Sequence, residues 1–451
     1  MPFLSRLRTF LCRERGASIP VMTALLLVPM TLIAGGAVDF VAHEKIRLAL
    51  QDALDRGVLA AAALNQSEDP RKLVASYLQT IPGRPEIELN LSEEKRTNYR
   101  KITASAKATY VPTFLQLADI RKLDVVANAS AQEARQNIEL SLVLDISGSM
   151  LDNGGMKQLK PAAKSFLDTM LKPDVRSFTS VSIVPFAGQV SVGSKAIYQY
   201  LATPFYGLTP LHGRVIQEKT WCFELPSGDF AAGTPAFAFR KQVPHFSVYN
   251  ISAAGKQPWW CPTDEAGITY PTNDVAYLKN RVELLRPFDG TGTAYGMKWG
   301  ELLLNPSMQS SLKAIGDKGL APIPEAFRSR PAAFDDKDTM KFIVLMTDGQ
   351  IGFQPRPTNG EAEVTDRNIP QTNLMYTQGQ SEAFYKQVCT YTKKQGITIF
   401  TIAFAISNNS IADSIASCAS QPGYAYRVDG IDMATAFRSI ATTLQQIRLV
   451  N

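Results

Sequence analysis

The chain has 451 residues, of which 45% are hydrophobic, and this length and composition suffice for two or three domains with sizeable cores. They exclude a chain that is disordered throughout. The 47 Lys and Arg residues exceed the 41 Asp and Glu residues by only 6, and the excess is dispersed apart from short clusters such as residues 95–101, so nucleic-acid binding has little support.

An uncharged stretch near the N-terminus predicts a membrane anchor. Residues 1–15 form a basic segment, and residues 16–38 contain no charged residue and are long enough to span a bilayer. Pro20 and Pro29 would bend such a helix without preventing it. The arginines of the basic segment predict a cytoplasmic N-terminus. A removable secretory signal is the alternative, but its apolar core would be shorter and would end at an A-x-A site, so we favour a retained transmembrane helix.

The region after this stretch predicts a helix and a small module. Apolar residues recur at helical spacing through residues 39–64, so the helix is expected to leave the membrane directly. Polar and apolar residues then alternate in 87–91, 102–110 and 123–129, which is typical of an antiparallel sheet. We interpret residues 39–136 as a helix that resembles those of pilins, followed by a small α+β module. The module, from residue 66 on, is expected to be a spacer or a pilin-like packing surface.

The segment 137–150, NIELSLVLDISGSM, carries the strongest chemical signal. Its alternating Ile and Leu residues, together with Val143 on the second face, predict a central strand that is covered on both sides. Asp145, Ser147 and Ser149 follow two residues apart in a turn with Gly148, so three hard oxygen ligands can converge on one divalent cation. Mg²⁺ is the natural candidate, and Mn²⁺ and Ca²⁺ take the same class of ligand.

This D-x-S-x-S pattern resembles the metal-ion-dependent adhesion site (MIDAS) of von Willebrand factor A domains. That family also needs a Thr in a Gly-rich loop that opens a helix, and an Asp that closes a later strand. Thr293 lies in the segment 289–304, and Asp348 ends the apolar segment 342–348. Thr291 competes for the role of the Thr, but Thr293 stands closer to the helical stretch.

The resemblance implies a division of roles among these residues. Ser147, Ser149 and Thr293 are expected to touch the metal, while Asp145 and Asp348 hold it partly through water. One position is left for a carboxylate of a protein partner.

Two other interpretations of these residues are possible. Asp and Ser are common turn residues, so a lone D-x-S-x-S is more often structural. A serine hydrolase is not favoured, because His43, His212 and His245 lie outside the expected site segments and no G-x-S-x-G motif is present. We therefore expect a binding protein that is not an enzyme.

The rest of the chain predicts a doubly wound α/β fold for residues 137–451. Apolar patterns predict helices around 159–170 and 437–447 and strands at 181–187 and 397–405, and such sheets bind ligands at the C-terminal ends of their strands. Two stretches interrupt this alternation and are expected to be insertions. They span about 188–287 and 351–380.

The whole arrangement resembles the TadG type of tight-adherence (Tad or Flp) pilus-assembly proteins, with a TadE/TadG-like N-terminal segment. The resemblance rests on the long N-terminal helix, the A domain, RERGA at residues 13–17, DISGSM at residues 145–150 and the C-terminal Cys-rich segment. A prepilin cleaved after Gly16 would carry Glu five residues on, where this chain has Val21. Processing by prepilin peptidase is therefore not expected.

The cysteines indicate an oxidising compartment. Cys12 lies alone on the inner side of the predicted anchor, and the four others follow on the outer side, where three connectivities are possible. None forms a C-x-x-C pair and His is scarce, so a zinc site is not favoured. We choose Cys222 with Cys261. The TadG-like pattern, which pairs a helix Cys with one in a later CAS segment, implies Cys389 with Cys418.

Together these patterns predict a single-pass protein of the bacterial inner membrane, with a cytoplasmic N-terminus and a periplasmic A domain. That domain is expected to bind an acidic side chain of a pilus-assembly or secretion component through the metal. The alternative is a surface adhesin that binds a host or matrix ligand through the same site. The identity of the partner and the oligomeric state stay open.

Overall fold

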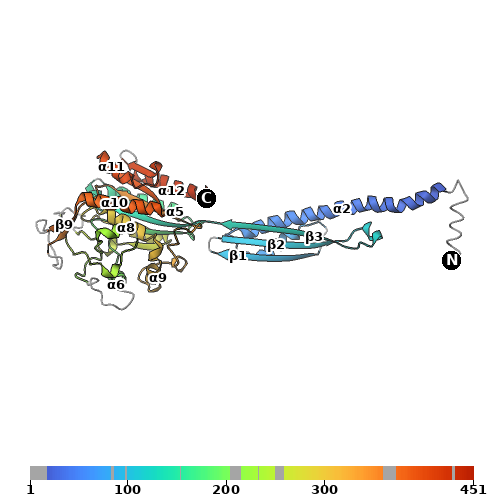
Figure 1. Cartoon of the computed structure of the whole chain (residues 1–451), viewed down its shortest axis with the longest axis horizontal. Helices are drawn as coiled ribbons and strands as arrows, with labels where there is room; N and C mark the ends of the chain where they lie inside the picture. Colours follow the sequence, from blue (N-terminus) through green and yellow to red (C-terminus); the bar gives the residue numbers. More distant parts are fainter. Residues whose placement is uncertain are drawn as a thin grey trace. The chain divides into compact units, whose positions relative to one another are not determined.

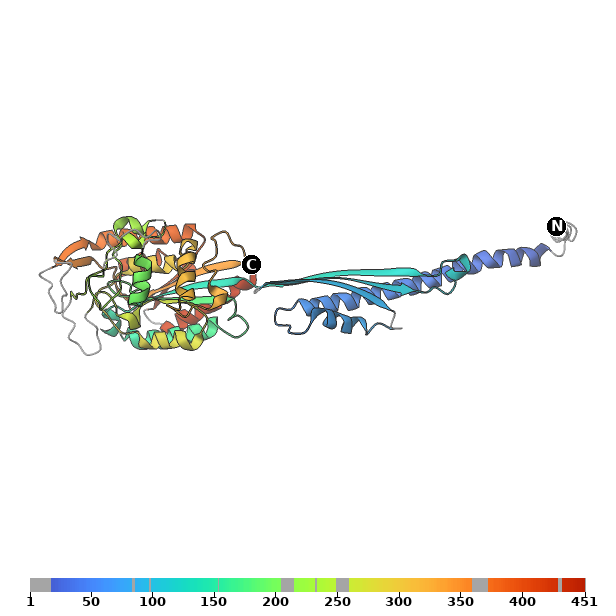
Figure 2. The same cartoon turned by 90° about the horizontal axis from the view of Figure 1, so that it is seen from below.

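The structure is a computed structural model that describes residues 18–82, 86–96, 99–152, 154–203, 215–231, 233–248, 259–358, 372–428 and 432–450. The predicted basic segment, with Cys12, and the first two residues of the predicted membrane span lie outside the described residues. The chain divides into two compact units, Met1–Arg135 and Gln136–Asn451, each of which has its own core (Figures 1 and 2).

The first unit is organised around one long helix, α2 (Ser18–Ala62), which continues through Pro29. Its N-terminal half carries exposed apolar side chains from Met22 to Val41. Its C-terminal half is amphipathic and buries Leu50, Leu54 and Val58. In the part of the chain that the structure describes, α2 is the one helix long and apolar enough to cross a membrane.

A three-stranded antiparallel sheet packs on the C-terminal half of α2. Its strands are β1 (Ile87–Arg96), β2 (Tyr99–Tyr110) and β3 (Leu123–Ala134), in that order. Small side chains such as Ala104 and Ala106 face the helix, so the helix can lie close to the sheet. A short helix, α3 (Pro70–Leu78), begins after Asp69, whose carboxylate accepts a hydrogen bond from the backbone N–H of Lys72 at 2.9 Å.

The second unit is built on a six-stranded sheet with the order β11-β10-β7-β4-β5-β6. All neighbours pair in parallel except β6, which is antiparallel to β5. The strands are β4 (Asn137–Asp145), β5 (Thr179–Phe186), β6 (Thr269–Thr272), β7 (Thr339–Thr347), β10 (Thr398–Phe404) and β11 (Ala425–Val428). Strand β4 is buried along almost its whole length, because helices cover both faces of the sheet.

The helices form two layers, so the unit is a doubly wound α/β fold as the sequence predicts. One layer contains α5 (Gly155–Met170), α7 (Val275–Leu284) and α12 (Met433–Val450). The other contains α8 (Thr293–Leu302), α10 (Gln378–Lys394) and α11 (Asn409–Ala416). Figure 1 shows α8 and α10 beside each other. The shorter helices are α4 (Ser149–Asp152), α6 (Lys195–Ala202) and α9 (Gln309–Asp317).

The predicted insertion at 188–287 is only partly an insertion. Its last part supplies β6 to the sheet, and it supplies α7, which packs on α5. Strand β6 is only four residues long and contains Pro271, which an edge strand tolerates because it lacks one neighbour. A strand this short shows too little alternation to be recognised in the sequence.

The second predicted insertion, 351–380, is also shorter than expected. It contains an antiparallel pair, β8 (Gln354–Pro357) and β9 (Thr372–Tyr376). Its final residues already belong to α10, which begins at Gln378 after a capping box between Thr377 and Gln380. That Thr-x-x-Gln signal marks the helix start in the sequence.

Both expected disulfides are present in the structure, Cys222–Cys261 and Cys389–Cys418, with sequence separations of 39 and 29 residues. The first joins two segments of the insertion around a small core of Val243, Phe246, Val248 and Trp260. The second joins α10 to the segment after α11.

The Cys222–Cys261 disulfide should contribute measurably to stability. Replacing both residues by Ala is expected to lower the free energy of unfolding by about 3 to 4 kcal/mol, because the unfolded chain regains the entropy of a long open loop. Urea unfolding followed by Trp fluorescence measures this, since all four Trp residues lie in the second unit. Cys12→Ser is the control and should leave the transition unchanged. An unchanged transition in the double variant would show that the surrounding core holds the insertion without the bond.

Candidate metal centre

The site lies at the C-terminal edge of the two central strands. Strands β4 and β7 are parallel neighbours, with Leu144 paired to Met346. Asp145 at the end of β4 and Asp348 just after β7 therefore emerge at the same edge of the sheet. Ligands of doubly wound sheets bind at this edge.

A chain of hydrogen bonds joins four of the five predicted ligands. The Asp145 carboxylate accepts from the backbone N–H of Ser147 at 2.7 Å. The hydroxyls of Ser147 and Ser149 lie 3.0 Å apart, and the Ser149 hydroxyl donates to Oδ1 of Asp348 at 2.7 Å. The structure thus brings Asp145, Ser147, Ser149 and Asp348 into one cluster.

The Asp145 carboxylate is completely buried. Burial raises the pKa of Asp145 above its ordinary value, and hydrogen bonds from Thr347 and Ser147 oppose that rise only in part. The Thr347 hydroxyl donates to Oδ2 of Asp145 at 2.5 Å. Since these partners are neutral, a cation at the site would supply the positive charge that favours the ionised carboxylate.

Thr293 is the first residue of α8 and is completely buried. Its hydroxyl oxygen has no hydrogen-bond partner among the described residues. Because a buried hydroxyl is seldom left unpaired, this oxygen suits a ligand that the protein alone does not provide.

Thr291, the competing residue, also lies close to the cluster. A Cβ atom placed on Gly349 would lie 3.6 Å from the Ser149 hydroxyl and 3.7 Å from the Thr291 hydroxyl. Both hydroxyls therefore approach the same point, beside Asp348. The geometry leaves both threonines as candidate ligands.

Backbone hydrogen bonds hold residues 288–293, which carry Thr291 and Thr293 and are called the threonine loop below. Phe288 N–H donates to the Ile146 carbonyl at 2.8 Å, and the Thr291 carbonyl accepts from Gly352 N–H at 2.8 Å. A Cβ on Gly292 would lie only 2.4 Å from the carbonyl oxygen of Gly188. Glycine at this position thus permits the loop to pack directly against the end of β5.

Trp260, which the sequence does not reveal as part of the site, covers this loop. A Cβ on Gly188 would lie 2.3 Å from the Trp260 ring, and a Cβ on Gly290 would lie 2.5 Å from it. Gly290 also has a φ of +78°, which only glycine adopts easily. Trp260 precedes Cys261, so the disulfide-bonded insertion helps to position the threonine loop. The sequence shows the WWCP cluster at residues 259–262 but does not indicate that Trp260 contacts Gly290.

The residues present fit a hard divalent cation. All donors are carboxylate or hydroxyl oxygens, which suit Mg²⁺, Mn²⁺ or Ca²⁺, and the buried Thr293 hydroxyl oxygen is available to bind such a cation. Over the described ranges, no group of three or more His, Cys, Asp or Glu side chains could hold a metal. The cation would therefore be held by the mixed carboxylate and hydroxyl set.

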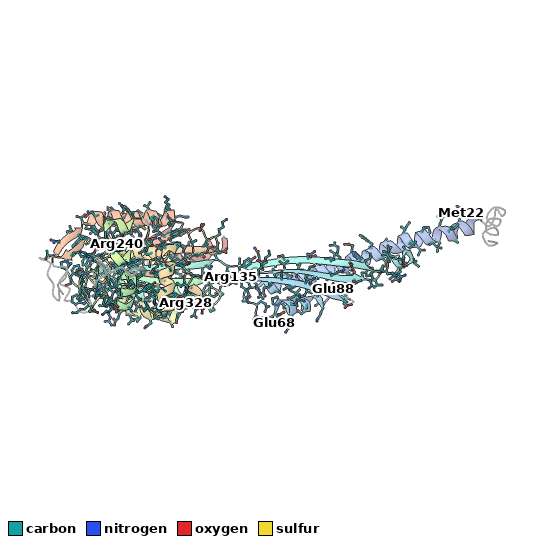
Figure 3. The ribbon with its side chains drawn as sticks, turned by 60° about the horizontal axis from the view of Figure 1, so that its bottom comes forward. Met22, Glu68, Glu88, Arg135, Arg240 and Arg328 are labelled. Atoms are coloured by element: carbon teal, nitrogen blue, oxygen red, sulfur yellow. A yellow bond between two sulfur atoms is a disulfide. The ribbon has the colours of Figure 1, made fainter. Side chains whose placement is uncertain are left out.

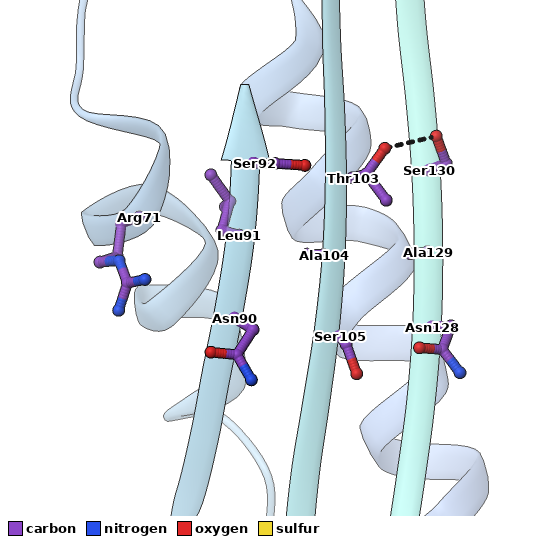
Figure 4. A pocket seen from close by; sticks show the side chains of 10 residues that line it. All are labelled: Arg71, Asn90, Leu91, Ser92, Thr103, Ala104, Ser105, Asn128, Ala129 and Ser130. Atoms are coloured by element: carbon purple, nitrogen blue, oxygen red, sulfur yellow. Dashed lines mark hydrogen bonds between the residues drawn. The ribbon is translucent and has the colours of Figure 1, made fainter. Parts of the chain in front are cut away.

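Two hollows lie away from this cluster, and none of the predicted metal ligands lines them. One, of about 620 Å³, lies over the polar face of the first unit's sheet, where Thr103 and Ser130 form a hydrogen bond of 3.2 Å (Figure 4). The other, also about 620 Å³, is mostly apolar and lies between Tyr200, Phe237 and Met308.

Comparisons with known proteins give distant structural likenesses. No protein-family model matches the chain, and no curated protein matches it. The pilus adhesin SpaC from Lactobacillus rhamnosus GG has a TM-score of 0.39 at 11% identity, over 81% of this chain and 35% of SpaC. This chain therefore spans about a third of the SpaC chain.

Two further solved structures are similar at the same low level. The vWF domain of the type V pili tip protein Mfa5 from Porphyromonas gingivalis has a TM-score of 0.37 at 13% identity, over 70% of this chain and 97% of that one. The pilus adhesin RrgA from Streptococcus pneumoniae has a TM-score of 0.34 at 10% identity, over 80% of this chain and 49% of RrgA. Likenesses this distant do not define an activity or a partner.

The hydroxyl of Thr347 should stabilise the buried carboxylate when no metal is added. Thr347→Val keeps the side-chain shape but removes a donor to Asp145, so the free energy of unfolding in EDTA should fall by about 1 to 3 kcal/mol. The same substitution in an Asp145→Asn background should cost less, because the charge that needs the donor is gone. Urea unfolding of the four chains gives the coupling energy between Thr347 and Asp145. A coupling energy near zero would contradict a stabilising hydrogen bond between them.

Proposed function

We propose that this protein is a membrane-anchored binding protein of the Tad or Flp pilus-assembly type, whose von Willebrand A-type unit binds a protein partner through a divalent cation. The observation that carries the proposal is the hydrogen-bonded cluster of Asp145, Ser147, Ser149 and Asp348 at the ends of two adjacent parallel strands. The unpaired, buried hydroxyl of Thr293 supports it.

Each residue has a separate task in this proposal. Asp145 and Asp348 provide negative charge, and the serines provide neutral oxygens from the turn between β4 and α4. A bound Mg²⁺ supplies a coordination position that attracts a carboxylate of the partner. The two serine hydroxyls bond to each other, and that of Ser149 donates to Asp348, an arrangement that suits ligation better than activation of a nucleophile by a histidine.

The N-terminal helix and the disulfides support the cellular part of the proposal. The apolar half of α2 is long enough to span a bilayer, and two disulfides in the second unit are typical of a compartment outside the cytoplasm. We therefore propose a cytoplasmic N-terminus and a periplasmic second unit. If the protein is instead a surface adhesin, the same site would bind a host or matrix ligand, and cell fractionation would find the chain in the outer membrane or outside the cell.

The metal site can be tested by calorimetry on the full chain in detergent. Mg²⁺ should bind to the unmodified chain, and Asp145→Ala should weaken binding most because it removes an anionic ligand. Ser147→Ala should weaken it less, because it removes one neutral oxygen. Thr390→Val, on the exposed face of α10, is the matched control and should change nothing.

The two threonines can be separated in the same experiment. If Thr293 is the ligand, as the sequence predicts, Thr293→Val should weaken Mg²⁺ binding and Thr291→Val should not. The reverse result would assign the role to Thr291, which approaches Gly349. If Mg²⁺, Mn²⁺ and Ca²⁺ all fail to bind at millimolar concentration, the metal-dependent function is wrong.

The anchor can be tested by alkaline carbonate extraction of membranes. The unmodified chain should stay in the membrane, whereas the Leu26→Arg, Ile33→Arg chain should be released, since each charge near the bilayer centre costs about 2.5 to 3.5 kcal/mol. Leu59→Arg is the control, because Leu59 is equally exposed but lies in the amphipathic half of α2. Release of the unmodified chain would indicate a cleaved signal and contradict the proposed anchor.

A further inference from the structure

The connection between β2 and β3, residues 111–122, is fastened to α2 and is called the hairpin tip below. The carboxylate of Asp39 on α2 accepts hydrogen bonds from the backbone N–H groups of Thr113, Phe114 and Leu115 at 2.8, 2.7 and 2.8 Å. It also accepts one from the Tyr110 hydroxyl at 3.0 Å. Burial alone would raise the pKa of Asp39, but these donors outweigh it, so the pKa lies below its ordinary value.

A pair of glycines lets the hairpin tip lie directly on the helix. A Cβ on Gly35 would lie 2.3 Å from the Phe114 ring, and a Cβ on Gly36 would lie 3.3 Å from Leu115. Phe114 also joins the side chains of α2 between Thr23 and Val38 around a mostly apolar hollow of about 570 Å³. The tip therefore continues the apolar surface of the helix.

Three large apolar side chains of the hairpin tip are exposed, on either side of the exposed Asp119. Val111, Leu117 and Ile120 are 57%, 70% and 41% exposed. Outside α2, Val126 is the remaining large hydrophobic residue that is exposed in the described part of the first unit. The tip ends with Arg121 and Lys122, both exposed, and Arg121 forms a surface ion pair with Asp119 at 3.0 Å. An apolar patch followed by basic residues matches the order of acyl chains and phosphates at a membrane surface.

The position along α2 places the tip at the edge of a bilayer. Ser18 to Val38 covers about 30 Å at the helical rise, which equals the thickness of the hydrocarbon core. Residues 35–39, and the tip that is bound to them, then stand where the helix leaves the hydrocarbon. Figure 3 shows that α2 extends beyond the sheet toward Met22, and most apolar side chains in this part of the helix are exposed.

We propose that the hairpin tip is a second membrane contact, in which Leu117 and Ile120 enter the interfacial layer of the bilayer that α2 spans. Lys122 meets the lipid phosphates, and Arg121 does so by exchanging its exposed, weak ion pair with Asp119. This inference rests on the proposed anchoring by α2. Two contacts with one bilayer fix the rotation of α2 about its own axis, which a single spanning helix leaves free.

Depth-dependent fluorescence quenching on the full chain tests this contact. Leu117→Cys is labelled with an NBD fluorophore in a Cys12→Ser background, and the chain is placed in vesicles of phosphatidylethanolamine and phosphatidylglycerol. Some lipids carry a nitroxide near the top of an acyl chain. Ile120→Cys repeats the measurement. Leu25→Cys reports the anchor, and Ser92→Cys is the control, since Ser92 points away from α2 roughly 24 Å along the sheet from the tip (Figure 4).

The inference expects several-fold stronger quenching at positions 117 and 120 than at position 92, together with quenching at position 25. Quenching at position 25 without quenching at 117 and 120 would overturn the second contact and leave the anchor intact. No quenching at position 25 would overturn the anchor, and the inference with it. Equal quenching at positions 117 and 92 would show a general surface association, and cross-linking of two Leu117→Cys chains without lipid quenching would assign the tip to a second copy. Either result would overturn the proposal.

Discussion

A carboxylate without access to water at the end of β4 is the constraint on which the second unit depends. Asp145 is buried because β4 is a central strand with helices on both faces, and its neighbour β7 ends at the same level. A charge there has to be neutralised or stabilised by donors, and the turn after β4 and the end of β7 provide them. The fold therefore explains why hydroxyl residues surround this acid: Ser147 and Ser149 lie in the turn, and Thr347 closes β7.

The long insertion has a structural relation to this edge of the sheet. Trp260 of the insertion lies over Gly188 and Gly290. The backbone of the insertion is also joined to the threonine loop, because the Asp289 N–H donates to the Trp259 carbonyl at 3.1 Å. The insertion is thus no independent appendage.

Much of this organisation can be predicted from sequence, because the patterns involved are local. The alternation in residues 137–145 indicates a buried strand, and the spacing of Asp145, Ser147 and Ser149 places three oxygens in one turn. The place of Asp348 beside them is expected from the resemblance to von Willebrand factor A domains, and the pairing of β4 with β7 brings it there. Strand β6 is missed because four residues with a proline carry little periodicity, and the early start of α10 is missed because its capping box was taken for part of a polar loop.

The contacts that could not be predicted are between distant segments. Nothing local in Gly188 or Gly290 indicates a tryptophan ring, and nothing in Asp39 indicates that it holds the turn after β2. The choice between Thr291 and Thr293 also depends on contacts with distant segments. Both belong to one short loop, so their difference depends on how that loop packs against Gly349 and β5, which sequence spacing does not specify.

The covered threonine loop has a consequence for the timing of maturation. Trp260 directly precedes Cys261, so the Cys222–Cys261 disulfide restrains the segment that carries the ring over Gly290. Thiols in a reducing cytoplasm stay unpaired. A chain whose cysteines are still reduced would therefore carry Asp145, Ser147 and Ser149 but lack this restraint on the threonine loop, so formation of the disulfide would complete this edge of the sheet.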